Sequence, residues 1–117
     1  MYSLCRDTVT VYRCTSEGIC RQVYTNANLQ MLDKLVEDTH TPEWERPFLL
    51  IVPGQADLQV GDRIMRGEGP EVRPEEWPKF LPENVEGLCQ VQFVQNQYLQ
   101  GICCHTEAGR KASTFLY

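Results

Sequence analysis

Residues 48–67, FLLIVPGQADLQVGDRIMRG, constrain the fold of this chain more than any other stretch. They open with the continuous apolar run FLLIV, which has the length of one strand and is ended by a Pro-Gly pair. After a Gly-Asp turn signal, a second short strand is expected over residues 62–66. Apolar runs bounded by proline and glycine are typical of strands and turns, not of helices. We therefore expect two strands of a small sheet that turns back on itself, with Val60 in its buried apolar centre.

Alternating residue patterns predict further strands towards both ends of the chain. Residues 8–14 (TVTVYRC) and 19–24 (ICRQVY) are separated by a four-residue turn that ends in Gly18, which predicts an N-terminal β-hairpin. Residues 88–99 (LCQVQFVQNQYL) place apolar side chains on one face and glutamines on the other, as a half-buried strand does. One more strand is expected within residues 101–111.

Residues 26–38, NANLQMLDKLVED, leave helix and strand open. The leucines and Val36 recur at helical spacing, and Asn26 is of a residue type that caps helices. Leu29 and Met31 also fit an extended strand that continues from the hairpin. The periodicity favours a helix, whereas the context favours a strand.

Two stretches read as irregular loops. Residues 39–47 contain two prolines and charges of both signs, and residues 68–87 contain four prolines and six glutamates. Within the second stretch, Pro74 followed by acidic residues is typical of the first turn of a short helix, which Pro78 and Pro82 keep short. The aromatic and apolar residues of this stretch are expected to fold back over the sheet.

Length and composition indicate one globular domain, residues 1–117, with 42% hydrophobic and 23% charged residues and one modest core. Five or six short strands with little helix predict a mainly β fold: a small antiparallel β-barrel with long loops and at most one or two short helices. The formal net charge of −5 disfavours a general phosphate-binding surface, so no sequence-specific nucleic-acid partner is expected. Neither an apolar stretch of membrane-spanning length nor a signal-peptide pattern is present, so no membrane association is expected.

The six cysteines are expected to be free thiols, mostly buried as small apolar side chains, because the chain lacks a secretory signal. The run Cys103-Cys104-His105 comes nearest to a metal site. Adjacent strand residues point to opposite faces, however, and no Cys-x-x-Cys pair supplies the other half of a zinc site. A buried thiol beside an exposed histidine is the expectation here. We expect no metal, no cofactor and no catalytic residue, since nothing in the spacing places a base beside a nucleophile.

Acidic and aromatic residues are the candidates for contacts with other proteins. The glutamates of residues 68–87 fit a solvated loop, or alternatively an acidic surface for a basic partner. Aromatic residues dominate interface hot spots, although Trp77 is alternatively a cover for the core. The candidate interface residues are Trp44, Glu71, Glu75, Glu76, Trp77, Phe115 and Tyr117.

Five segments carry a resemblance to a known family. In order they are DTVTVYR (residues 7–13), FLLIVPG (48–54), LQVGDRIMRGE (58–68), VQFVQNQYLQG (91–101) and HTEAGRK (105–111). With this ordered set, the chain resembles the small minor capsid and head–tail joining proteins, or neck proteins, of tailed phages and prophages of Gram-positive bacteria. The cysteines and the proline-rich insert after Gly67 depart from the family's pattern.

The resemblance implies a structural virion protein, not an enzyme. Such proteins join head to tail in the neck by protein–protein contacts, assemble as oligomeric rings and help to retain packaged DNA. The implied partners are portal-side adaptor or tail proteins and further copies of the chain. The implied location is the virion and, during assembly, the cytoplasm of the bacterial host. The alternatives are a small bacterial β-barrel adaptor that binds a peptide or protein without catalysis and, third, a metal- or thiol-dependent enzyme.

Overall fold

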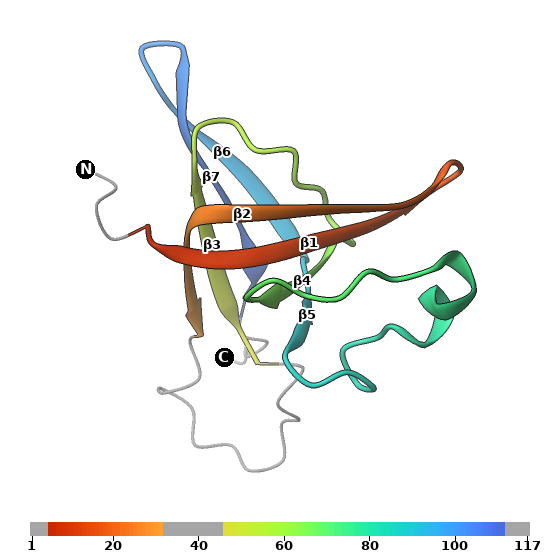
Figure 1. Ribbon diagram of the computed structural model, residues 1–117. Helices are drawn as coiled ribbons and strands as arrows, with labels where there is room; N and C mark the ends of the chain where they lie inside the picture. The colour runs from red at the N-terminus through yellow and green to blue at the C-terminus, as the bar shows by residue number, and fades with distance from the viewer. Residues whose placement is uncertain (1–4, 32–45, 112–117) are drawn as a thin grey trace, which may run out of the picture.

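The computed structural model describes residues 5–31 and 46–111, which form seven strands and one short 3₁₀ helix (Figure 1). In chain order the elements are β1 (Asp7–Thr15), β2 (Gly18–Met31), β3 (Phe48–Pro53), β4 (Arg63–Arg66), η2 (Pro74–Lys79), β5 (Leu88–Gln90), β6 (Phe93–Leu99) and β7 (Ile102–Arg110). Among the described residues the fold is therefore mainly β, as the residue patterns predict.

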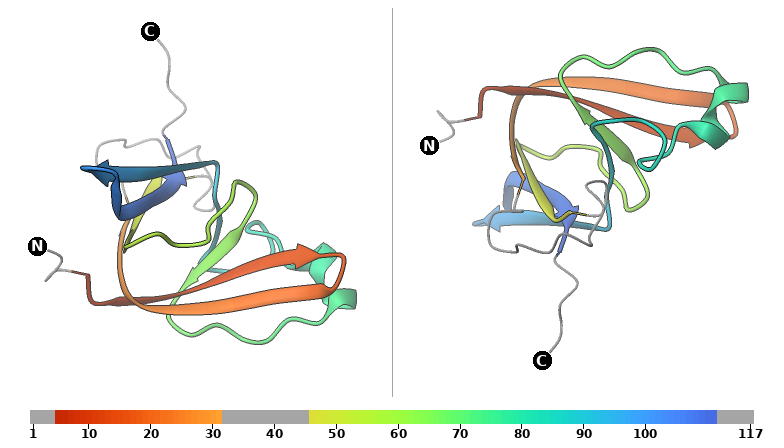
Figure 2. Two further views of the ribbon diagram at one scale, coloured as in Figure 1. Left: turned by 90° about the horizontal axis from the view of Figure 1, so that it is seen from above. Right: turned by 90° about the horizontal axis from the view of Figure 1, so that it is seen from below.

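All seven strands belong to one antiparallel sheet in the order β5-β4-β1-β2-β3-β7-β6. The long strand β2 joins the two halves of this sheet, since residues 18–27 face β1 and residues 28–31 pair with β3. Seen from above and from below, the sheet curls so that the β1–β2 and β6–β7 hairpins lie on different sides of the molecule (Figure 2). The result is a half-barrel, which confirms the predicted barrel-like, antiparallel fold.

The two edge strands of the sheet, β5 and β6, are consecutive in the chain. Between them, the Val91 backbone N–H donates to the Asp62 carbonyl at 2.8 Å, and the Gln92 N–H donates to the Gly109 carbonyl at 2.7 Å. The single strand predicted for residues 88–99 is therefore wrong: the segment pairs first with β4 and then with β7. Alternation of apolar residues continues through the change of partner, so the residue pattern does not show it.

The N-terminal hairpin is confirmed, with Thr15 paired to Gly18 at its turn. For residues 26–38 the sequence leaves helix and strand open. Residues 26–31 are a strand, because they continue β2. The helix that the periodicity favoured is wrong there, since pairing with β3 supplies the hydrogen bonds that a helix would make internally. The rest of that segment lies outside the described residues. Strand β7 confirms the strand expected within residues 101–111.

The segment 48–67 supplies β3 and β4 as predicted, but these two strands do not pair with each other. β3 lies between β2 and β7, whereas β4 lies between β1 and β5. The expectation that Val60 is buried is also wrong, because its side chain is 65% exposed in the turn before Gly61. Leu58, two residues earlier, packs into the core instead.

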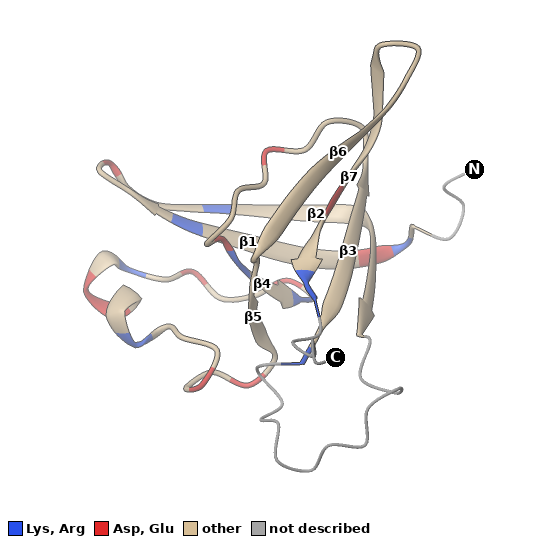
Figure 3. Ribbon diagram, turned by 180° about the vertical axis from the view of Figure 1, so that it is seen from behind, with Lys and Arg blue, Asp and Glu red and all other residues tan. Residues whose placement is uncertain are grey.

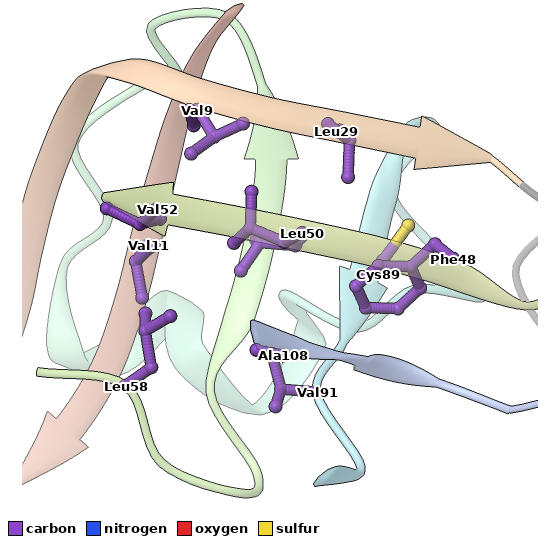
Figure 4. Close-up of a cluster of buried hydrophobic side chains, with 12 residues drawn as sticks. Val9, Val11, Leu29, Phe48, Leu50, Val52, Leu58, Cys89, Val91 and Ala108 are labelled. Atoms are coloured by element: carbon purple, nitrogen blue, oxygen red, sulfur yellow. The ribbon is translucent and has the colours of Figure 1, made fainter. Parts of the chain in front are cut away.

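The main core lies inside the curl of the sheet (Figure 4). Every second residue of β3 faces inwards, because successive strand side chains point to opposite faces: Phe48, Leu50 and Val52 are buried. A second cluster covers the other face of β1, where the rings of Tyr12 and Phe80 meet edge-to-face at 4.7 Å. The proline-rich loop thus folds back over the sheet, as predicted.

Candidate functional site

Four of the seven predicted interface residues lie on the described proline-rich loop around η2. They are Glu71, Glu75, Glu76 and Trp77. The other three, Trp44, Phe115 and Tyr117, lie outside the described residues. The structure therefore brings together the acidic candidates and one aromatic candidate.

The start of η2 is held by contacts between Arg73 and the two acidic residues that follow Pro74. The Arg73 backbone N–H donates to the Glu76 carboxylate at 2.9 Å, and the Arg73 guanidinium lies 3.5–3.6 Å from the carboxylates of Glu76 and Glu75. The hydrogen bond from the Arg73 backbone, followed by that from its side chain, lowers the pKa of Glu76. Both acids are exposed, and the lowered pKa of Glu76 favours its ionised form, as a contact surface for a cationic partner requires.

Glu71, Glu75 and Glu76 line one shallow hollow of about 520 Å³. Lys79 lines the same hollow, and Figure 3 shows basic and acidic residues alternating along this loop. The surface is therefore mixed in charge rather than uniformly acidic. Such mixed, exposed charge is typical of the rim of a protein interface.

Trp77 is half-buried and belongs to the second core cluster. The Arg63 guanidinium lies over its ring at 3.8 Å from the centroid and donates to the carbonyls of Trp77 (3.0 Å) and Phe80 (2.6 Å). Desolvation by this burial lowers the pKa of Arg63. The arginine therefore ties the proline-rich loop to β4, and Trp77 acts as a cover for the core.

The tip of the β6–β7 hairpin is an apolar surface that the candidate residues do not include. Tyr98, Leu99 and Ile102 are 59%, 64% and 70% exposed there. The hairpin turns through Gln100 and Gly101, both with positive φ (55° and 82°), as in tight two-residue hairpin loops. Its sequence signal is a Gln-Gly turn flanked by large apolar residues rather than polar ones.

This tip projects from the body of the sheet (Figure 1). Single exposed apolar residues are common on protein surfaces, but a gathering of three at a projecting end indicates a contact site. Tyrosine and aliphatic side chains can enter a pocket on a partner. The tip is therefore the described surface best suited to dock into another protein.

A larger hollow of about 600 Å³ lies beside residues 82–87. Its lining includes the apolar side chains of Leu29, Ile64 and Leu88 and the charged side chains of Arg66 and Glu86. An apolar lining with a few charged groups is typical of a site that binds a small molecule or a peptide side chain.

The run Cys103-Cys104-His105 lies on β7, and all three residues are half-buried. The expectation that His105 is exposed is wrong, because its imidazole packs beside Glu107, with His105 Nε2 and Glu107 Oε2 3.0 Å apart. Within residues 5–31 and 46–111, no group of three or more His, Cys, Asp or Glu side chains is arranged to hold a metal ion. The six cysteines all lie in these ranges and are free thiols in the structure, but the expectation that most of them are buried is wrong: only Cys89 is buried, and Cys14 and Cys20 are exposed.

Comparison of the chain with family models, with curated proteins and with solved structures finds no match. The described part of the chain contains no helix with the length and apolarity needed to cross a membrane. The class of protein that the fold defines is a small antiparallel half-barrel with projecting hairpins.

Proposed function

We propose that this protein is a structural component of the virion of a tailed phage or prophage, which joins head to tail in the neck without catalysis. Its partners would be portal-side adaptor or tail proteins and other copies of itself in a ring. In this role it would also help to retain packaged DNA. The proposal rests on the ordered set of segments that resembles neck and minor capsid proteins.

The single structural observation that supports the proposal best is the exposed apolar tip of the β6–β7 hairpin. Tyr98, Leu99 and Ile102 lie there, at the end of a two-stranded arm. A joining protein needs such an arm, because a strand pair holds its tip in place while apolar side chains enter a neighbouring subunit. The mixed charges around η2 suit the wetter rim of the same contacts.

Deleting the gene from the bacterial strain that encodes it tests the proposal. In a lysate of the induced prophage, electron microscopy should then show separated heads and tails, and the count of infectious particles should fall sharply. Mass spectrometry of purified virions should detect the protein. Genes for portal, scaffold and tail proteins should flank its gene.

A matched pair of variants tests the role of the tip. Ile102→Ser and Val60→Ser each remove a β-branched apolar side chain of similar exposure, 70% and 65%. Only Ile102→Ser should reduce the yield of joined particles, because Val60 lies in a different surface turn. Equal yields for both variants would remove the tip from the joining mechanism.

The hollow beside residues 82–87 favours one second candidate, an adaptor that binds a peptide or protein without being part of a virion. An adaptor would be missing from purified particles, and particles would assemble normally without it. In that case Met31→Arg, which places a charge at an exposed side chain of the hollow and outside the core, should weaken capture of its partner.

A further inference from the structure

In the described part of the chain, the outer edge of β6 is an open edge of the sheet. β6 pairs with β7 on one side, and within the described residues no strand pairs with its other side. The opposite edge strand, β5, has only three residues, whereas β6 has seven. An unpaired strand of this length presents a row of free N–H and C=O groups that can accept another strand.

β6 also lacks the features that usually protect an edge strand. Its sequence, FVQNQYL, contains no charged residue and no proline, and Figure 3 shows the strand uncoloured along its whole length. The irregularity in its pairing with β7 lies on β7, where Cys104 is the extra residue, so β6 itself runs regularly. Proteins usually place lysine, proline or a bulge on an exposed edge to prevent pairing between copies. No residue of β6 opposes such pairing between copies.

The order of residues in β6 is self-complementary about its centre, Asn96. Antiparallel pairing of two copies centred on Asn96 would set Phe93 opposite Leu99, Val94 opposite Tyr98 and Gln95 opposite Gln97. Apolar residues would meet apolar residues, and amides would meet amides, with no charge opposite another charge. Such cross-strand matches are the unit of sheet stabilisation.

We propose that β6 is a homodimerisation edge, on which two copies of this chain pair antiparallel across a two-fold axis into one continuous sheet. A two-fold contact uses the same surface on both partners and is closed at two copies, so it does not propagate. This inference does not rest on the role in a virion, since it follows from the edge and its sequence alone. Either proposal can fail without the other.

The size of the contact predicts a weak dimer. One pair of seven-residue strands buries on the order of 300–400 Å² per partner, about half of what stable interfaces bury. The dissociation constant is therefore expected to be on the order of 100 µM. The pair would form where local concentration is high, as in an assembling particle.

Sedimentation velocity on the full chain, in reducing buffer and over about two decades of concentration around that value, measures the association. Two double variants then test the register. Gln95→Lys with Gln97→Lys sets lysine opposite lysine twice across the axis, whereas Gln95→Lys with Gln97→Glu sets lysine opposite glutamate twice. Gln95 and Gln97 pair with Glu107 and His105 of β7, which alternate with the buried Thr106 and Ala108 and so lie on the face away from the core; both variants therefore leave the core unchanged.

The lysine–lysine variant should associate at least about tenfold more weakly than the native chain, and added salt should reduce that loss. The lysine–glutamate variant should associate at least as tightly as the native chain. Circular dichroism melts of both variants check that each remains folded. In the native chain, amide hydrogen exchange of β6 should slow as concentration rises.

Three results would overturn the proposal. The first is a native chain that stays monomeric through the whole concentration range. The second is that both double variants associate as tightly as the native chain, which would assign association to another surface such as the hairpin tip. Open-ended polymers instead of a closed dimer would exclude two-fold pairing.

Discussion

Asp62→Asn is predicted to destabilise the fold far more than Asp57→Asn, although both carboxylates face Arg13. The Asp62 side chain is 2% exposed and accepts hydrogen bonds from Arg13 Nε (2.8 Å), Arg13 Nη2 (2.9 Å) and the Gln59 backbone N–H (2.8 Å). The hydrogen bond with Asp62 is the largest cause that raises the pKa of Arg13. This pair ties β1 to the turn that precedes β4.

The size of the stability loss in Asp62→Asn follows from the hydrogen bonds that the asparagine amide cannot make. Asparagine keeps the shape of Asp62 but carries no charge, and its NH₂ group points a donor at Arg13 or at the Gln59 N–H. At least one charge-assisted hydrogen bond is lost and one buried donor is left facing another, a cost of about 2–4 kcal/mol. Asp57 is 70% exposed and lies 3.3 Å from Arg13 Nη1, so its replacement should cost less than about 0.5 kcal/mol.

Urea denaturation of the native chain and both variants, followed by circular dichroism, measures the two free energies of unfolding. The midpoint should fall clearly for Asp62→Asn with an unchanged slope, and barely for Asp57→Asn. If the two variants lose equal stability, the buried ion pair contributes nothing beyond a surface pair, and the reasoning is refuted.

Three further predictions concern the core, β7 and pH. Leu58→Asp should cost more than about 3 kcal/mol in urea denaturation, because the side chain is 7% exposed, whereas Val60→Asp should cost less than about 0.5 kcal/mol; equal losses would contradict this. Gly109→Ala should lower stability by about 2 kcal/mol or more in a thermal melt, since the added methyl would overlap the Phe48 carbonyl; an unchanged melt would count against it. Burial raises the pKa of Tyr12 and also that of Tyr24, so part of the tyrosinate absorbance should appear above the ordinary pKa of about 10, and Tyr12→Phe should remove the share of Tyr12 and leave that of Tyr24. The stability from neutral Tyr12 is present below that ordinary value and is lost as pH rises through the folded pKa.

Much of the strand content could be predicted because strand patterns are local. Residues 8–14 and 19–24 alternate around a turn that ends in Gly18, and the hairpin forms where this pattern places it. The short helix after Pro74 is local in the same sense, because proline and acidic residues suit its first turn. The helical spacing in residues 26–31 does not produce a helix, because pairing with β3 outweighs a weak periodicity and makes the segment a strand.

The candidate site could be predicted only in part. Glu71, Glu75 and Glu76 could be named as candidates because clustered charge is visible in the residues, and the loop brings them to one hollow; their role in an interface stays a prediction. The exposed hairpin tip was missed, because Leu99 and Ile102 look like core residues of alternating strands. Only the length of the β6–β7 arm places them beyond the body of the sheet.

The residues by themselves determined the class of fold, since alternation, turns and prolines act over a few neighbouring positions. Only the tertiary structure decided which strands meet. β3 and β4 follow each other in the chain but lie in different halves of the sheet, and residues 88–99 supply both of its edges. Strand pairing depends on how the whole sheet curls around one core, and this is why Leu58 is buried while Val60 faces solvent.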